Sequence, residues 1–216
     1  MKKSFKTINT RATSEIIEKK SKFIANVCPV KSEEEAISFI SEIKKQHYNA
    51  RHNCFAYIIN GQIPIMRFSD DGEPSGTAGK PILDVLTNEC LENIVVVVTR
   101  YFGGILLGTG GLVRAYGKSA KEGVIAGKIV EIDLYSTIYI SCDYSISGKI
   151  QYEIENSNFI LFNTEYTDMV KFTVYVNEAE KENFKNHIIN ISNNQAVVLI
   201  SETIMLKLID GKICLN

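Results

Sequence analysis

The 216-residue sequence has no apolar stretch long enough to cross a membrane. Its longest purely aliphatic run, residues 94–98, is far shorter than the roughly 20 residues that a membrane-spanning helix needs. The first residues, MKKSFKTINTR, contain no apolar segment of the kind found in a secretion signal. We therefore expect a cytoplasmic protein with no membrane partner.

Closely spaced cysteines are also lacking. The five cysteines lie at least 26 residues apart, so no CxxC pair is present to begin a zinc site or a redox motif. Isolated cysteines in a cytoplasmic chain stay reduced and behave as small apolar residues. The sequence therefore predicts no metal site, and we expect no cofactor.

Neither sign of charge dominates the whole chain, whose formal net charge is −1, but its two parts differ. Residues 1–133 contain 18 Lys and Arg against 15 Asp and Glu, whereas residues 134–216 contain 6 against 10. Affinity for phosphate comes from clustered positive charge. A nucleic-acid-binding surface that extends over both parts is therefore not expected.

Glycine and proline are scarce near the end of the chain. Of the 14 glycines, 12 precede residue 128, and so do all four prolines. The last third therefore follows a different structural plan from the rest. We predict two domains, residues 1–133 and 137–210, joined between residues 133 and 137.

The second predicted domain has the pattern of a ferredoxin-like fold. Its apolar residues alternate in four segments and recur with helical spacing in two others. Strands are predicted at residues 137–142, 159–166, 169–176 and 195–202, and helices at residues 144–156 and 178–191. The order βαββαβ is that of a ferredoxin-like split unit.

The first predicted domain is a more irregular α+β arrangement. Ser32 precedes three glutamates and is a good N-cap for a helix. Small residues on the last helix, Gly123 among them, favour a close approach to a sheet. Strands are predicted at residues 5–8, 15–20, 22–29, 52–59, 65–68, 93–101 and 129–133, and helices at residues 33–45, 81–88 and 112–126.

Three segments of this domain combine glycine with charged and aromatic residues: residues 51–54, 69–81 and 100–111. The most specific part is the string VTRYFGG at residues 98–104, followed by LG and GGL. Together the segments resemble the signature of the IMPACT N-terminal domain family, over roughly residues 15–125. The remaining tail is similar to the C-terminal domain of the bacterial YigZ branch of that family.

The resemblance implies a first domain with the fold of a small-subunit ribosomal protein domain and of domain IV of elongation factor G. It implies a tail similar to domain V of the same factor. Eukaryotic IMPACT proteins restrain the amino-acid-starvation kinase by competing for its ribosome-associated activator. The domain with which they make that contact is not recognisable in this sequence, so only a translation-linked binding role is expected here.

The glycines beside Phe102 leave backbone N–H groups uncovered where the next helix is predicted to begin. Such groups suit an anion, but the same glycines also fit a sharp turn from strand to helix. Arg100 and Arg114 are the cations best placed to add charge, although each is also explained as a surface or ion-paired arginine. A P-loop is rejected, because the spacing is wrong and GKS at residues 117–119 falls inside a helix.

The acidic loop admits two interpretations. Asp70, Asp71 and Glu73 would suit Mg²⁺ or proton transfer, yet DDGEP is also ordinary turn chemistry. We favour the turn, with Ser75 or Thr77 capping the helix that follows.

His52 and Cys54 lie two residues apart and face the same side of a predicted strand. A thiolate–imidazole pair is conceivable, but we favour a buried cysteine beside a hydrogen-bonded histidine. Tyr101 and Phe102 would suit stacking on a base or anchoring a partner, but at the end of a buried strand one of the two is more often part of the core.

We predict that the three segments converge on one face of the first domain. No catalytic residue is assigned. The candidate binding residues are Arg51, His52, Asp70, Asp71, Glu73, Ser75, Thr77, Arg100, Tyr101, Phe102, Gly103, Gly104, Thr109, Gly110 and Arg114.

Two functions follow from this surface. The first is a translation-associated regulator in which a basic and aromatic face of the first domain contacts RNA or a ribosome-associated protein. That face is predicted to consist of Arg51, Arg100, Tyr101 and Arg114. The alternative is an enzyme acting on a phosphorylated small molecule, with phosphate held by the glycine-rich loops and Asp70, Asp71 or His52 transferring a proton. A concave pocket would favour the enzyme, and a shallow basic face would favour the binding protein.

Overall fold

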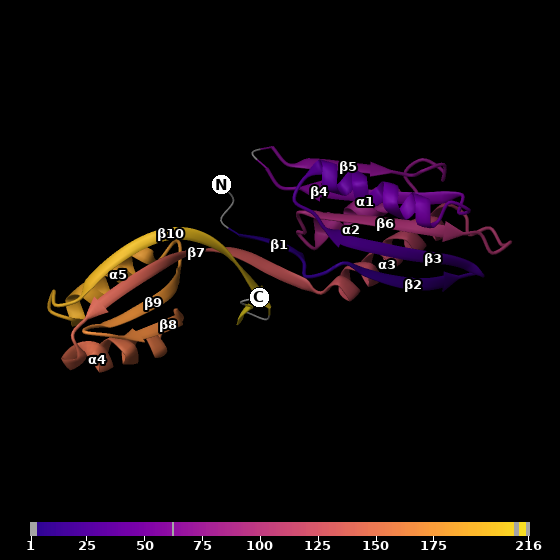
Figure 1. The fold of residues 1–216 in the computed structure, drawn as a ribbon. Coiled ribbons are helices and arrows are strands. Elements are labelled where there is room, and N and C mark those ends of the chain that lie inside the picture. The colour runs from indigo at the N-terminus through magenta and orange to yellow at the C-terminus, as the bar shows by residue number, and fades with distance from the viewer. Residues whose placement is uncertain (1–3, 62, 210–211, 215–216) are drawn as a thin grey trace. The chain divides into compact units, whose positions relative to one another are not determined.

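The computed structural model describes residues 4–61, 63–209 and 212–214. The chain divides into two compact units, Met1–Glu131 and Ile132–Asn216. Residues 1–3 and 210, at the outer ends of the two predicted domains, lie outside the described residues. Two sheets organise the chain, and each is described with the unit that it builds (Figure 1).

The first unit has a five-stranded sheet with its most apolar strand at the centre. The order is β2–β3–β6–β4–β5, and every neighbouring pair is antiparallel. The unbroken aliphatic run of β6 suits the central place, because both faces of a central strand can be buried. The strands are β2 (Ala12–Glu18), β3 (Ser21–Pro29), β4 (His52–Ile59), β5 (Ile65–Ser69) and β6 (Ile94–Tyr101).

Helices cover both faces of this sheet (Figure 1): α1 on one face, α2 and α3 on the other. Side chains of β6 alternate between the two cores. Val95 and Val97 join the core under α1, whereas Val96 and Val98 join the core under α2 and α3. The helices are α1 (Glu33–Gln46), α2 (Gly79–Asn88) and α3 (Thr109–Gly127).

Two predicted local features of these helices are confirmed. The Ser32 hydroxyl caps α1 by accepting a hydrogen bond from the backbone N–H of Glu35 at 3.3 Å. In α3, a Cβ on Gly123 would come within 2.9 Å of both Ala25 and Val27. The glycine therefore lets α3 lie directly against β3.

The second unit has the βαββαβ order of the predicted ferredoxin-like fold. Its strands follow the order β10–β7–β9–β8, in which the first and third strands of the motif lie side by side at the centre. β11 extends this sheet beside β10. The elements are β7 (Ile129–Cys142), α4 (Tyr144–Glu155), β8 (Ile160–Tyr166), β9 (Val170–Asn177), α5 (Lys181–Ile191), β10 (Val197–Ile209) and β11 (Lys212–Cys214). β1 (Ser4–Ile8) belongs to the first unit.

The two helices of this unit pack on one face of the sheet. Ile150 and Ile154 of α4 and Phe184 and Ile188 of α5 are buried in one cluster with alternate residues of β7 and β9. These are the positions that helical spacing predicts. The α+β fold class with a ferredoxin-like second part is therefore confirmed.

Several boundaries differ from the predictions. β10 continues to Ile209 rather than ending at residue 202, β2 begins at Ala12 rather than at residue 15, and α3 begins at Thr109 rather than at residue 112. β7 runs unbroken through residues 134–136, where the sequence predicts a joint between two strands. Those residues contain neither glycine nor proline, and Tyr135 and Ser136 are buried, so extended backbone continues. β2 ends at Glu18 because Lys19 and Lys20 form a two-residue turn with φ of 44° and 67°.

Candidate functional site

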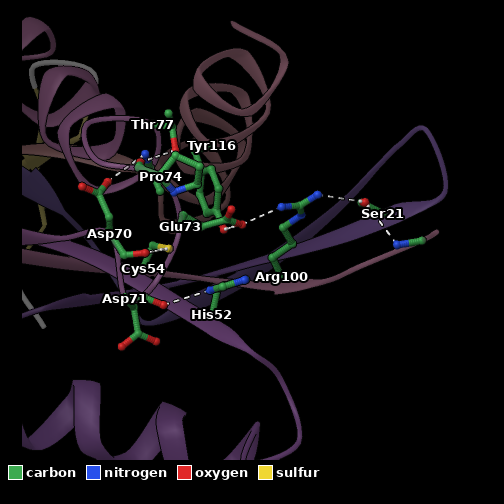
Figure 2. Close-up of polar contacts among 12 residues, drawn as sticks. Ser21, His52, Cys54, Asp70, Asp71, Glu73, Pro74, Thr77, Arg100 and Tyr116 are labelled. Carbon is green, nitrogen blue, oxygen red and sulfur yellow. Dashed lines mark hydrogen bonds and ion pairs between the residues drawn. The ribbon is translucent and has the colours of Figure 1, made fainter. Parts of the chain in front are cut away.

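Four loops of the first unit gather at one end of its sheet, which we call the loop edge. β3 and β4 begin there and β6 ends there, because Lys22 pairs with Tyr101 and His52 pairs with Arg100. The loop edge consists of residues 19–20, 47–51, 70–78 and 102–108, together with Arg114, which lines a hollow with Lys19 and Leu107. The three segments singled out in the sequence converge at this edge, as predicted (Figure 2).

A buried ion pair joins the acidic loop to the end of β6 (Figure 2). Nη1 of Arg100 donates to Oε1 of Glu73 at 2.7 Å, and the two side chains are only 7% and 4% exposed. The Tyr116 hydroxyl donates to the same oxygen at 2.9 Å. Burial raises the pKa of Tyr116 far above its ordinary value, so this hydroxyl stays protonated. Arg100 is therefore buried and ion-paired. This is the second of the two explanations that the sequence leaves open for this residue.

Asp70 organises the acidic loop. Its carboxylate accepts hydrogen bonds from the backbone N–H groups of Gly76, Ala78 and Gly79, at 2.8, 3.0 and 2.8 Å. These groups lie at the start of α2, so Asp70 caps that helix from nine residues away. The predicted capping by Ser75 or Thr77 is wrong, because the Thr77 hydroxyl donates to the Pro74 carbonyl and Ser75 is exposed.

Asp71 and His52 hold the other side of this loop. Oδ2 of Asp71 accepts from the backbone N–H of Asn53 at 2.7 Å, and Oδ1 pairs with Lys44 at 2.7 Å. Nδ1 of His52 lies 2.9 Å from the Asp71 carbonyl, which can only accept, so Nδ1 carries the proton in this contact. All three acids of the loop thus have partners within the protein.

Cys54 does not form an ion pair with His52. Its thiol donates to the Asp70 carbonyl at 2.9 Å (Figure 2). Burial raises the pKa of Cys54 from an ordinary 9.0 to about 12. The thiol is therefore neutral at physiological pH, and the favoured interpretation, a buried cysteine beside a hydrogen-bonded histidine, is the one that the structure shows.

The glycine-rich loop is shaped mainly by backbone geometry. A Cβ on Gly103 would come within 2.0 Å of the Lys20 backbone, and the Gly103 N–H donates to the Ser21 hydroxyl at 3.2 Å. Gly104 and Gly108 have φ of 83° and 72°, which glycine adopts without strain. A sharp turn from strand to helix therefore explains these three glycines. Thr109 and Gly110, in the first turn of α3, remain exposed.

Exposed cations lie around this loop. Arg51, Arg114, Lys19 and Lys20 are exposed, and Nη1 of Arg114 lies over the first turn of α3 near Gly110. Lys19 and Arg114 also line a hollow of about 230 Å³ beside that turn. Lys19 and Lys20 are not among the binding residues predicted from the sequence. Their only signal is a pair of charged residues between two alternating strands, which is not an ordinary turn signature.

The two aromatic residues after Arg100 take different places. The Tyr101 hydroxyl donates to Oδ1 of Asn49 at 3.0 Å and contacts Nδ1 of His47, so Tyr101 is half-buried and engaged. Phe102 is 54% exposed. Phe102 is thus the aromatic residue that is open to a ligand.

Two further findings concern the described residues as a whole. They include no group of three or more His, Cys, Asp and Glu side chains arranged to hold a metal ion. None of their helices combines the length and the apolar character that crossing a bilayer requires.

Comparison with known proteins gives matches over both units. The Impact N-terminal domain matches residues 19–124, and a domain of unknown function, DUF1949, matches residues 140–195. IMPACT family member YvyE of Bacillus subtilis is 45% identical over 193 residues, 89% of each chain. IMPACT family member YigZ of Escherichia coli is 32% identical over 186 residues, 85% of this chain and 91% of that protein. A crystal structure of a hypothetical protein, 30% identical, aligns with a TM-score of 0.58 over 94% of this chain and 99% of its own.

Proposed function

From the premise that the chain belongs to the IMPACT family, we propose that it is a translation-associated regulator whose first domain binds RNA through the loop edge. The link to translation is carried over from the eukaryotic IMPACT proteins. The choice of RNA depends on the charge and the side chains of this edge.

The single observation that supports RNA binding is a difference between the charged side chains in the described part of the loop edge. The acidic ones have partners within the protein, whereas no acidic partner is found for the exposed cations. Asp70, Asp71 and Glu73 are satisfied by backbone N–H groups, by a lysine or by Arg100. Within the described residues no acidic partner is recorded for the exposed cations Lys19, Lys20, Arg51 and Arg114. An edge whose acids are internally neutralised and whose cations are free presents positive charge to solvent, which favours a polyanion.

The enzyme alternative has weaker support. Its proton-transfer groups were to be Asp70, Asp71 or His52. The two carboxylates are tied to backbone N–H groups, whereas a general base must reach a proton of the substrate. His52 donates the proton on Nδ1 to a carbonyl, so Nε2 is the nitrogen that would accept a proton. The glycine loop, which was to hold phosphate, uses one of its N–H groups on Ser21.

The test is co-sedimentation of the purified full chain with ribosomes and with ribosomal RNA, at low and high salt. Arg51→Gln/Arg114→Gln removes two charges from the loop edge. Lys31→Gln/Lys121→Gln removes two from elsewhere: Lys31 follows β3 at the opposite end of the sheet, and Lys121 lies in the second half of α3. We expect binding that weakens with salt, and a loss in the first variant only.

Thermal unfolding of both variants serves as the control, because all four side chains are exposed and their replacement should leave the fold intact. Equal losses in the two variants would show that the loop edge is not the binding surface. Absence of sedimentation with either ribosomes or RNA at low salt would contradict the proposed function itself.

A further inference from the structure

Phe102 is held by the protein on one side and open on the other. The Arg100 guanidinium carbon lies over its ring, 5.6 Å from the ring centre. That guanidinium is itself fixed by Glu73 and lies over the ring of Phe23 at 5.5 Å. Yet Phe102 is 54% exposed. A buried, immobile cation thus supports one face of an aromatic ring whose remaining surface faces solvent.

The backbone beside this ring is fixed as well. The next residue, Gly103, donates its N–H to the Ser21 hydroxyl and lies against the backbone of Lys20. A side chain at residue 103 would collide with Lys20, so the glycine is what allows this approach. The contact holds Phe102 beside the turn formed by Lys19 and Lys20.

These two lysines are themselves in an uncommon conformation. Both have positive φ, a region in which lysine is strained and in which Asn-Gly is the favoured pair. Both lysines are exposed at the tip of a tight hairpin, and the backbone of Lys20 lies against Gly103, the residue after Phe102. The arrangement is a flat apolar surface with neighbouring positive charge, and each acid in the described part of the loop edge has a partner. Such a surface matches a nucleotide with its base and its phosphate.

We infer that Phe102 is a stacking platform for an unpaired base, and that Lys19 and Lys20 contact the adjacent phosphates of a single-stranded RNA segment. This inference rests on the proposed function and names the class of RNA. A base inside a duplex has both faces covered by its neighbours, so only an unpaired base can offer a face to this ring.

The test is fluorescence anisotropy with a labelled single-stranded 12-nucleotide RNA and with the same strand annealed to its complement. We expect tighter binding of the single strand. Phe102→Leu keeps the apolar volume but removes the aromatic face, so affinity for the single strand should fall roughly ten-fold, within the range of aromatic–base stacking. Phe102→Tyr should retain affinity within about two-fold, since its ring still stacks.

Leu106→Ala is the matched control, because Leu106 lies in the same loop and is 82% exposed. It should change affinity for the single strand by less than about two-fold, because an aliphatic side chain has no aromatic face on which a base can stack. A protein partner would instead respond to the loss of either apolar side chain. A 2-aminopurine base in the RNA gives an independent signal in the unmodified protein, since its fluorescence decreases when it stacks.

Outcomes separate the two proposals. Equal affinity for single strand and duplex, with loss in Arg51→Gln/Arg114→Gln, would overturn the stacking inference and leave RNA binding intact. Unchanged 2-aminopurine fluorescence on saturation, or equal losses for Phe102→Leu and Leu106→Ala, would also overturn it. No binding of either RNA at low salt would contradict the proposed function.

Discussion

Replacing the turn Lys19-Lys20 by Asn-Gly should make the protein more stable while it binds RNA less well. Both lysines have positive φ, 44° and 67°, in a two-residue hairpin turn. A left-handed conformation costs a residue with a side chain about 1–2 kcal/mol, whereas Asn-Gly is the pair best suited to this turn. Glycine reduces this gain in stability by roughly 0.5–1 kcal/mol, because it increases the entropy of the unfolded chain.

The net gain for Lys19→Asn/Lys20→Gly is therefore about 1 kcal/mol, which corresponds to a rise in Tm of roughly 2–4 °C for a chain of this size. Both lysines are exposed, and no ion pair of theirs is recorded among the described residues, so little stabilisation is lost with them. The same change removes two phosphate contacts. The slope of log affinity against log salt for single-stranded RNA should fall by about 1.4.

Thermal unfolding and anisotropy on the same preparation measure both effects. A variant that is more stable and yet binds more weakly excludes unfolding as the cause of the weaker binding. The reasoning is refuted if Tm falls, because the lysines would then stabilise the turn, or if affinity and salt slope stay unchanged, because the lysines would then contact no phosphate.

Three further predictions concern the fold. Glu73→Gln should destabilise the protein by about 3 kcal/mol in urea unfolding, because it leaves the buried charge of Arg100 without its partner; a cost under 1 kcal/mol would mean that the pair is not essential. Gly117→Ala should stabilise the protein by about 0.5–1 kcal/mol, because a Cβ at this helical position meets open space. Gly123→Ala should instead destabilise it by about 1–3 kcal/mol, because its Cβ would collide with β3. The opposite order of stabilities would contradict the packing of α3. Above pH 9 the folded protein keeps the Cys54 proton that the unfolded chain loses. This thiol therefore lowers the free energy of unfolding by ~1.4 kcal/mol per pH unit up to about pH 12. In urea unfolding from pH 8 to 11, stability should decline less steeply in Cys54→Ala than in the unmodified protein, and an identical decline would refute this prediction.

The elements of the fold could be read from local patterns, because each depends on residues close together in the chain. Ser32 caps α1, and the aliphatic run at residues 94–98 forms the central strand. The VTRYFGG string also indicated the family that the relatives confirm. Convergence of the three segments followed from strand ends meeting at one edge of a sheet.

The roles of individual side chains at the site could not be read in this way. Whether Arg100 faces solvent or Glu73 depends on a partner 27 residues away. The capping of α2 by Asp70 could not be predicted, because residue preferences for helix capping apply to residues adjacent to the helix, and Asp70 lies nine residues before its first residue. Lys19 and Lys20 were missed because their conformation is imposed by pairing of β2 with β3 against the preference of lysine.

The central claim, that unpaired cations at the loop edge bind RNA phosphates, is tested most directly by the salt dependence of affinity. The measurement is anisotropy of single-stranded RNA over a range of salt concentrations, for the unmodified chain and for a variant with Lys19, Lys20, Arg51 and Arg114 all changed to Gln. Each phosphate contact contributes about 0.7 to the slope for single strands, so the four changes should lower it by about 3. An unchanged slope in a variant that remains folded would contradict the account.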